Sequence, residues 1–471
     1  MPTFVARSSM PVPSRELFAW HERAGAFERL APAWETMSIR LAQGGIRDGG
    51  RLHFAVHKGP LRLPWHALHS GYIEGEQFVD TQERGPFARW QHTHHCLPDP
   101  VDPTRSVLED HIEYALPLGS LGRAFGGAHI RRLLERMFIT RHQRTRLDLL
   151  RHASFAGPPP RVLLAGASGA IGRELAAYLS TGGCVVTRLV RRAPAAPDER
   201  RWNPADATLD PRVLDDIDAV INLCGSPILR RWTDANKRDI LHSRVTAAAT
   251  LARALAAHPR REQITLLQAS GSGIYPASRV PLDESAPLDS SPSSFPAAVA
   301  QQWECATEPA SDAGVRVVHL RIGAALSTRG GLLAGVLPAA RLGLLGPLGP
   351  GTQLFSWIAM DDLIGAIEHA MRTPYLHGSL NCVAPEPISN TDFTRALAGV
   401  LHRPVFPRVP ARLLHVLMGE LASEALRDNA VRPARLLDSG FVFRHPSIER
   451  ALRTELGLPA DHEGIEITHA P

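Results

Sequence analysis

The sequence predicts an α/β protein: a doubly wound parallel sheet with a small C-terminal lobe, preceded by an α+β region. Three observations predict this class. From residue 161 onward, short apolar runs alternate with helical patterns, which is the signature of parallel β-α-β units. Most of the first 150 residues instead alternate apolar with polar positions, as half-buried antiparallel strands do. A proline-rich stretch separates the two regions.

Length and composition describe an ordinary globular chain. At about 150 residues per domain, 471 residues correspond to about three domains. The net charge of +5 is spread over many arginines and indicates no nucleic-acid partner. The five cysteines lie far apart, without the spacing of a zinc site or a disulfide frame, so we expect a reducing, cytoplasmic location. Residues 1–15 lack the apolar core of a signal peptide. The apolar stretch 332–350 is interrupted by Arg341, prolines and glycines, so no membrane span is expected. The arginines of 131–151 fit the solvated stripe of an amphipathic helix, so membrane-surface contact is not expected either.

The N-terminal region, residues 1–153, is expected to pair a curved sheet with one long helix. Phe4–Ser8 is a strand candidate, and Ser14 is a candidate N-cap for a helix carrying Leu17 and Trp20. Further strands are expected at Glu35–Leu41, Arg51–His57, Leu63–Gly71, Gln77–Arg84, Phe87–Leu97 and Ser106–Leu116. A helical pattern over Leu121–His152 closes the region.

After a linker at 154–160, residues 161–389 are expected to form the parallel sheet, and residues 390–471 a smaller C-terminal lobe. The predicted parallel strands are Val162–Ala165, Val185–Val190, Ala219–Leu223, Ile264–Ala269 and Val315–Ile322. The predicted helices between them are Gly172–Ser180, Asp234–Ala257 and Pro296–Ala313.

The most informative motif joins the first of these strands to its helix. Gly166, Gly169 and Gly172 follow an apolar run and precede a helical pattern. In a dinucleotide-binding fold of the Rossmann type, such glycines permit a tight turn, close approach to a pyrophosphate, and close packing of helix on strand. Amides of the loop and of the first helical turn then meet the phosphate charge. The predicted contacts are Gly166, Ser168, Gly169, Ala170, Ile171 and Gly172.

Two further segments belong to the same predicted site. The second strand ends at Arg191 and Arg192 with no acid between residues 183 and 197, which favours the 2′-phosphate of NADP over NAD. An exposed basic loop is the alternative interpretation. The run Asp218–Gly225 is another buried strand, which places Leu223, Cys224 and Gly225 at the carboxyl edge of the sheet beside the ligand; tight packing alone is equally compatible with Cys224.

Dispersed segments resemble the atypical short-chain dehydrogenase/reductases, in particular the YfcH-like epimerase family proteins. The segments that carry the resemblance are Asn222–Ile228, Arg231-Trp232, Ser243-Arg244, Ala269–Tyr275, Leu320–Gly323, Gly330-Gly331, Ser356–Ile358, Asp361-Asp362, Arg403-Pro404, Gly419-Glu420 and Gly440-Phe441. The resemblance implies a Rossmann domain, a nicotinamide dinucleotide and a C-terminal lobe over the substrate crevice. It also implies that Arg244 is a cofactor or crevice residue, with a solvated helix face as the alternative.

The catalytic residues of that superfamily are only partly present. Its Tyr-x-x-x-Lys pair aligns with Phe295 and Val299, neither of which can transfer a proton. Tyr275, just beyond a predicted strand, is the remaining candidate for proton donation, and Ser270 matches the superfamily's serine. Both residues also fit a packing or turn-forming role. Arg321 lies within an apolar strand, so it needs either a structural ion pair or an anionic ligand.

The order of elements in residues 1–153 resembles the START-like (SRPBCC, polyketide cyclase/dehydrase-like) superfamily. The resemblance implies an α+β helix-grip fold whose sheet wraps the long helix around a cavity for an apolar ligand. In the same region, alternation puts His92, His94 and Cys96 on one strand face, with Asp110 and His111 in a nearby strand. Such neighbours lie about 6–7 Å apart along a straight strand, so we expect no metal site there.

The function most compatible with these features is an NADP(H)-dependent oxidoreductase or nucleotide-sugar-epimerase-like enzyme acting on a small, unidentified substrate. The missing Tyr/Lys pair leaves an alternative open. In that alternative, the chain binds NADPH as a sensor or scaffold without turnover, with a lipophilic-ligand-binding domain fused to it.

Overall fold

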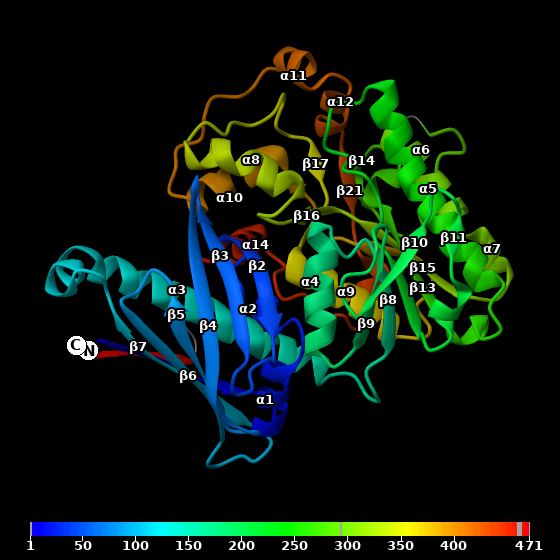
Figure 1. Cartoon of the computed structure of the whole chain (residues 1–471). Helices are drawn as coiled ribbons and strands as arrows, with labels where there is room; N and C mark the ends of the chain where they lie inside the picture. The colour runs from blue at the N-terminus through cyan, green and yellow to red at the C-terminus, as the bar shows by residue number, and fades with distance from the viewer. Residues whose placement is uncertain (1, 293, 459–463, 471) are drawn as a thin grey trace. The chain divides into compact units, whose positions relative to one another are not determined.

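The computed structural model describes residues 2–292, 294–458 and 464–470 (Figure 1). The chain folds into two compact units. The first unit contains the chain up to residue 158, residues 177–183 and the residues from 456 onward. The second contains Pro159–Ala176 and Cys184–Glu455. No helix in the described part of the chain is both long and apolar enough to span a bilayer.

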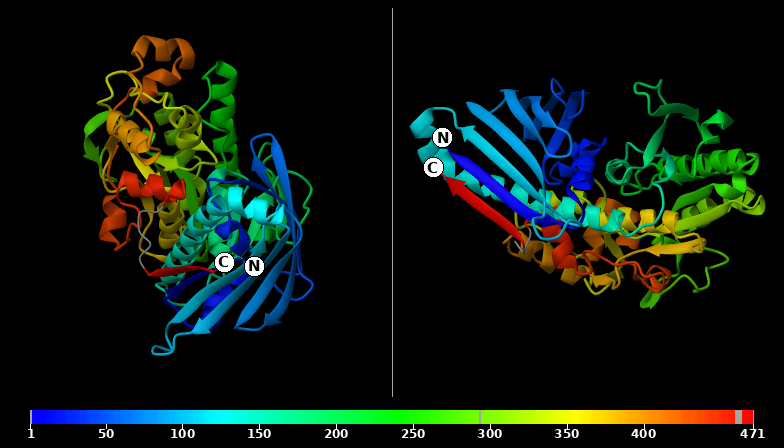
Figure 2. Two further views of the ribbon diagram at one scale, coloured as in Figure 1. Left: turned by 90° about the vertical axis from the view of Figure 1, so that its left-hand side faces the viewer. Right: turned by 90° about the horizontal axis from the view of Figure 1, so that it is seen from below.

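The first unit contains an eight-stranded antiparallel sheet with the strand order β2-β3-β4-β5-β6-β7-β1-β22. The strands are β1 (Thr3–Met10), β2 (Thr36–Gln43), β3 (Arg51–Lys58), β4 (Leu61–Ile73), β5 (Gln77–Arg84), β6 (Arg89–Pro98), β7 (Ser106–Ala115) and β22 (Ile465–Ala470). Its helices are α1 (Ser14–Glu22), α2 (Ala26–Leu30) and α3 (Gly119–His152). The long helix lies along one face of the curved sheet (Figure 2).

A buried apolar cluster joins α3 to the sheet. The rings of Phe4 and Phe138 pack 5.2 Å apart, and the cluster also includes Trp90 and Ile112. The predicted N-cap of the first helix is wrong. Pro13 occupies that position without a side-chain cap, because Ser14 is already helical. The sheet and the helices have the predicted order, whereas membership of the START-like superfamily stays a prediction.

The final strand corrects the predicted C-terminal lobe. β22 pairs antiparallel with β1, with Ala470 opposite Thr3, so the chain ends in the sheet where it begins. The alternation of β22 side chains predicts a strand, but no local pattern in a sequence names the partner of a strand.

The second unit contains a sheet with the order β11-β10-β9-β8-β12-β13-β15-β19. Its strands are β8 (Arg161–Ala165), β9 (Val185–Val190), β10 (Glu199–Asn203), β11 (Thr208–Leu209), β12 (Ala219–Asn222), β13 (Thr265–Gly271), β15 (Arg316–Ile322) and β19 (Gly378–Cys382). From β10 to β19 all neighbours are parallel. The chain moves outward from β8 to β10 and then returns to the other side of β8 at β12, so the predicted doubly wound Rossmann fold is confirmed.

Helices cover both faces of this sheet (Figure 1). They include α4 (Ala170–Thr181), α5 (Asp234–Ala256), α6 (Phe295–Cys305), α7 (Glu308–Asp312) and α9 (Met360–Arg372), with 3-10 turns η1 (Pro211–Leu214), η2 (Arg261–Gln263) and η3 (Ser272–Ile274). The single helix predicted at Pro296–Ala313 is wrong. It breaks after Cys305, because Pro309 has no N–H to bond the Cys305 carbonyl and its ring would clash with that carbonyl.

The remaining elements form the lobe at the end of this unit. A small sheet has the order β14-β21-β17-β20, and β16 pairs with β18. The strands are β14 (Ser278–Leu282), β16 (Ala324–Leu326), β17 (Leu354–Phe355), β18 (Trp357–Ala359), β20 (Ile388–Ser389) and β21 (Asn429–Val431). The helices are α8 (Gly331–Arg341), α10 (Asn390–Val400), α11 (Ala411–Met418), α12 (Leu421–Ala425), α13 (Ala434–Asp438) and α14 (Ile448–Glu455). Because this sheet takes strands from before residue 390, the lobe is built from both sides of the predicted boundary.

Candidate functional site

The glycine loop lies between β8 and α4, at the point where the strand order reverses. Gly166 has a φ of +88°, and a Cβ on it would lie 2.8 Å from the Leu223 carbonyl carbon. A Cβ on Gly172 would lie 2.3 Å from the Gly166 carbonyl oxygen. Neither position accepts a side chain. The loops after β8 and β12 therefore meet at the switch point, where ligands of doubly wound sheets bind.

Gly169 differs from its two neighbours. A Cβ there would make an ordinary 3.4 Å contact with the Gly166 carbonyl oxygen, so protein packing does not require glycine. Its amide donates to that carbonyl at 3.0 Å, and α4 begins at the next residue, Ala170. The first amides of a helix have no partner within the helix, and the positive end of the helix dipole lies there. The geometry of this loop suits an anion, and its middle glycine leaves room for one to approach.

The arginines after β9 have different partners. Arg188 pairs with Asp198 at 2.6 Å, and Arg192 donates to both carboxylate oxygens of Glu199. Those hydrogen bonds from Arg192 lower the pKa of Glu199 to about 2. Arg192 is thus already paired with Glu199, which lies just after the stretch 183–197 that contains no acidic residue. This geometry argues against Arg192 as a free phosphate ligand.

Arg191 is exposed and has no ion pair within the described residues. Burial raises the pKa of the Cys224 thiol to about 12, although the positive charge of Arg191 acts in the opposite direction. The effect indicates that the guanidinium lies near the loop after β12. Of the three arginines, Arg191 is the one available to a ligand at the switch point.

The side chains of Asn222 and Arg244 fix the loop after β12 through its backbone. The Asn222 side chain donates to Gln268 at 2.9 Å and accepts from the Cys224 amide at 3.1 Å. Arg244 is 9% exposed and donates to the Ser226 carbonyl at 2.9 Å. Its guanidinium carbon lies 2.8 Å from where a Cβ on Gly225 would be.

Burial lowers the pKa of Arg244 to about 10, and its guanidinium lies 4.9 Å from the centre of the Trp303 ring. The solvated-face alternative for Arg244 is therefore wrong. The geometry supports a residue that positions the Leu223–Gly225 loop through the backbone, rather than one that presents its charge to a ligand.

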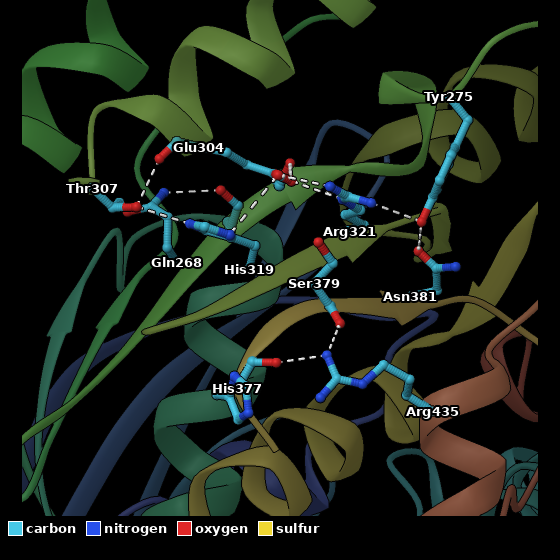
Figure 3. Close-up of polar contacts among 12 residues, drawn as sticks. Gln268, Tyr275, Glu304, Thr307, His319, Arg321, His377, Ser379, Asn381 and Arg435 are labelled. Atoms are coloured by element: carbon cyan, nitrogen blue, oxygen red, sulfur yellow. Dashed lines mark hydrogen bonds and ion pairs between the residues drawn. The ribbon is translucent and has the colours of Figure 1, made fainter. Parts of the chain in front are cut away.

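The two predicted catalytic residues lie in one buried polar network. Figure 3 shows its members Tyr275, Arg321 and Glu304. The Tyr275 hydroxyl donates to Asn381 and accepts from Arg321, both at 2.8 Å. Arg321 also donates to both carboxylate oxygens of Glu304 at 2.9 Å. The Ser270 hydroxyl donates to Glu304 at 2.7 Å. Arg321 therefore has the structural ion pair that the sequence left as one of two interpretations.

This network argues against Tyr275 as a proton donor. Tyr275 is 1% exposed, and protein groups take both the proton and an acceptor site of its hydroxyl. Burial raises the pKa of Tyr275, against the lowering effect of Arg321. The Ser270 hydroxyl is likewise directed to Glu304. Their contacts favour the packing role for both residues. Ser270 ties β13 to α6 through Glu304, and Tyr275, which follows η3, ties that turn to β15 and β19.

The helix position of the missing Tyr/Lys pair is apolar. Phe295 packs edge-on against Trp232 at 5.1 Å, and Val299 belongs to the same cluster. Lys237 of α5 lies 5.4 Å from the centre of the Phe295 ring and pairs with Glu420 of the lobe. Lys237 could not be singled out from the sequence, because its two partners, Phe295 and Glu420, lie 58 and 183 positions further along the chain.

Comparison with known proteins identifies the family of this chain. Residues 162–381 match the NAD dependent epimerase/dehydratase family, and residues 409–455 match a domain of unknown function. An epimerase family protein from Mycobacterium bovis is 39% identical over 295 residues, which cover 62% of this chain and 96% of the relative. The human epimerase family protein SDR39U1 is 32% identical and is covered to 98%. The chain belongs to the SDR39U1-like epimerase family proteins.

Two solved structures extend the comparison. A nucleoside-diphosphate sugar epimerase from Corynebacterium glutamicum is 31% identical, with a TM-score of 0.79 over 97% of this chain and 90% of that chain. The human SDR39U1 structure, which contains NADPH, is 31% identical, with a TM-score of 0.57 over 63% of this chain and 99% of that chain. A UDP-glucuronic acid 4-epimerase from Bacillus cereus with NAD is 16% identical and shares the fold, with a TM-score of 0.52.

Proposed function

We propose that the second unit binds NADP(H) at the switch point and transfers hydride to or from a small substrate bearing a carbonyl or hydroxyl group. The observation that carries the proposal is the glycine cradle itself. Gly166 and Gly172 are required by backbone packing, whereas Gly169 is free of that requirement and opens toward the approach of a diphosphate.

The preference for NADP(H) rests on Arg191. An arginine fork matches a phosphate dianion, and Arg191 lacks the acidic partner that occupies Arg192. The human relative was solved with NADPH, whereas more distant structures contain NAD. We infer that Arg191 meets the 2′-phosphate and that the backbone of Leu223–Gly225 lines the other side of the crevice.

When bound, the cofactor supplies a hydride at its nicotinamide ring. The chain supplies amides for the diphosphate, a guanidinium for the 2′-phosphate, and a loop fixed by Arg244 and Asn222. Ser270 and Tyr275, the candidates from the sequence, contribute to the shape of the crevice by holding the strand ends. The substrate class follows the relatives: we propose a small hydroxylated molecule, with nucleoside-diphosphate sugars tested first.

The test compares NADPH with NADH on the wild-type chain and on Arg191→Gln and Arg192→Gln chains. Removing a charged hydrogen-bonding partner costs about 1.5–3 kcal/mol, or about 10–150-fold in Kd. We expect Arg191→Gln to weaken NADPH binding by that factor and to leave NADH binding nearly unchanged, as measured by fluorescence titration. Arg192→Gln is the matched control and should retain most of the preference. Equal NADPH and NADH affinities in the wild-type chain would contradict the assignment.

A further inference from the structure

A second polar cluster lies in the first unit. Asp80 of β5 and His92 and His94 of β6 each place a ligand atom within 4.8 Å of the other two. His92 and His94 are 2% and 7% exposed. The strand register explains the meeting: Asp80 lies opposite His92, and His94 lies opposite Asp110 of β7.

The distances suit a metal ion. Asp80 Oδ2 lies 3.0 Å from His92 Nδ1 and 3.4 Å from His94 Nε2. In a tetrahedral zinc site with bonds of about 2.0–2.1 Å, neighbouring ligand atoms are about 3.3 Å apart. The two imidazole rings lean together until their centres are 3.7 Å apart. That convergence removes the spacing objection that applies to a straight strand.

The carboxylate of Asp110 contacts the histidine nitrogens that point away from the proposed metal. His92 Nε2 donates to Asp110 Oδ1 at 2.9 Å, and His94 Nδ1 lies 2.7 Å from the same oxygen, off the line of a good hydrogen bond. His142 donates from Nε2 to Asp110 Oδ2 at 2.7 Å, while its Nδ1 accepts from Ser8. A carboxylate behind a histidine fixes the tautomer and turns the other nitrogen toward the metal.

Cys96 and His111, the other residues of this sequence pattern, do not take part. Cys96 lies in the neighbouring apolar cluster, and His111 is opposite Thr93, one residue out of phase with the buried side chains. His69 lies opposite Asp80, and its buried Nδ1 has no hydrogen-bond partner within the described residues. His69 therefore lies beside the site without being one of its three ligands, and its Nδ1 could hydrogen-bond an exchangeable fourth ligand such as water.

Charge balance points the same way. The Asp110 carboxylate is 3% exposed and the Asp80 side chain 18% exposed, and the charge of Arg141 acts on both without a hydrogen bond to either in the described structure. A divalent cation bound by Asp80, His92 and His94 would add positive charge beside both carboxylates. We propose that Asp80, His92 and His94 bind one divalent transition-metal ion of the zinc type, with Asp110 as the positioning carboxylate.

The experiment uses the full chain, stripped with a chelator and then dialysed separately against Zn²⁺ and Co²⁺. We expect one Zn²⁺ per chain by elemental analysis, and Co²⁺ absorption bands of a four- or five-coordinate site. Zn²⁺ affinity should fall at least about 10-fold in His94→Gln, and about 10–100-fold in Asp110→Asn. His95→Gln is the matched control, because His95 is the next residue on the same strand and has the opposite facing; it should bind as the wild type does.

Substoichiometric Zn²⁺ uptake by the wild-type chain would overturn the proposal. So would a His94→Gln chain with wild-type near-UV circular dichroism and unchanged Zn²⁺ affinity. If His94→Gln does not fold, Asp80→Asn decides, because it keeps the shape of the side chain and removes its charge. Equal loss of affinity in His95→Gln would identify surface histidines as the ligands and also contradict the proposal.

Discussion

Two buried polar clusters in this chain follow opposite rules of assembly. In the parallel sheet, Glu304 accepts from one guanidinium, that of Arg321, and from the Ser270 hydroxyl, while Arg321 also donates to the Tyr275 hydroxyl. In the antiparallel sheet, Asp80 and Asp110 share the imidazoles of several histidines and no guanidinium bonds to either in the described structure.

The difference separates a structural network from a ligand-ready one. A carboxylate paired with arginine is neutralised permanently, because arginine does not lose its proton in proteins. A carboxylate paired with imidazoles is neutralised only by a proton or by a cation. The first arrangement locks strands together, whereas in the second His92 Nδ1 and His94 Nε2 converge on Asp80 Oδ2, where we propose the metal.

The largest effect is expected from Arg321→Met. It leaves Glu304 buried without its partner, which costs about 3–5 kcal/mol of stability. Urea unfolding of the full chain measures this cost. The double variant Glu304→Gln/Arg321→Met removes both charges and should recover part of the loss. A loss below about 1 kcal/mol in the single variant would show that the pair does not lock the sheet.

A smaller effect, confined to the other cluster, is expected from zinc. At about 100 times its Kd, a bound ligand stabilises the folded state by about 2.7 kcal/mol. Zn²⁺ should raise the unfolding temperature of the wild-type chain and not that of Asp80→Asn, as measured by calorimetry. The same shift in both chains would place the ion elsewhere and would erase the distinction between the clusters.

Tyr275→Phe should have a still smaller effect, because only one hydroxyl is lost. Its partners Arg321 and Asn381 keep other hydrogen bonds, so we expect a loss of about 1–3 kcal/mol in urea unfolding. NADPH-dependent turnover, measured with the first active substrate, should persist. Tyr375→Phe is the control, because that side chain is 65% exposed. Loss of turnover at unchanged stability would restore Tyr275 as the proton donor.

The features predicted correctly from the sequence are those that depend on residues close together in the chain. The glycine loop and the parallel strands follow from periodicity and from residues adjacent in the chain, such as Gly166 and Gly172. The break before Pro309 was equally local and was missed, because the apolar pattern on either side continues.

The remaining differences arise from long-range pairing. Glu199 pairs with Arg192 because β9 and β10 are neighbouring strands. Asp80 contacts His92 because β5 and β6 pair in one particular register. The pairing of β22 with β1 joins the two ends of the chain. A single sequence contains the residues of such pairs without stating which strand lies beside which.

The most direct test of the central claim is calorimetric titration of NADPH into the wild-type and Gly169→Asp chains. The Cβ of residue 169 meets nothing closer than 3.4 Å, so the variant should fold normally while placing a carboxylate in the diphosphate cradle. We predict saturable binding of one NADPH per wild-type chain and at least about a 100-fold weaker affinity in the variant, since like charges in one site cost several kcal/mol. Equal affinity in the two chains, or no binding to the wild-type chain, would contradict the account.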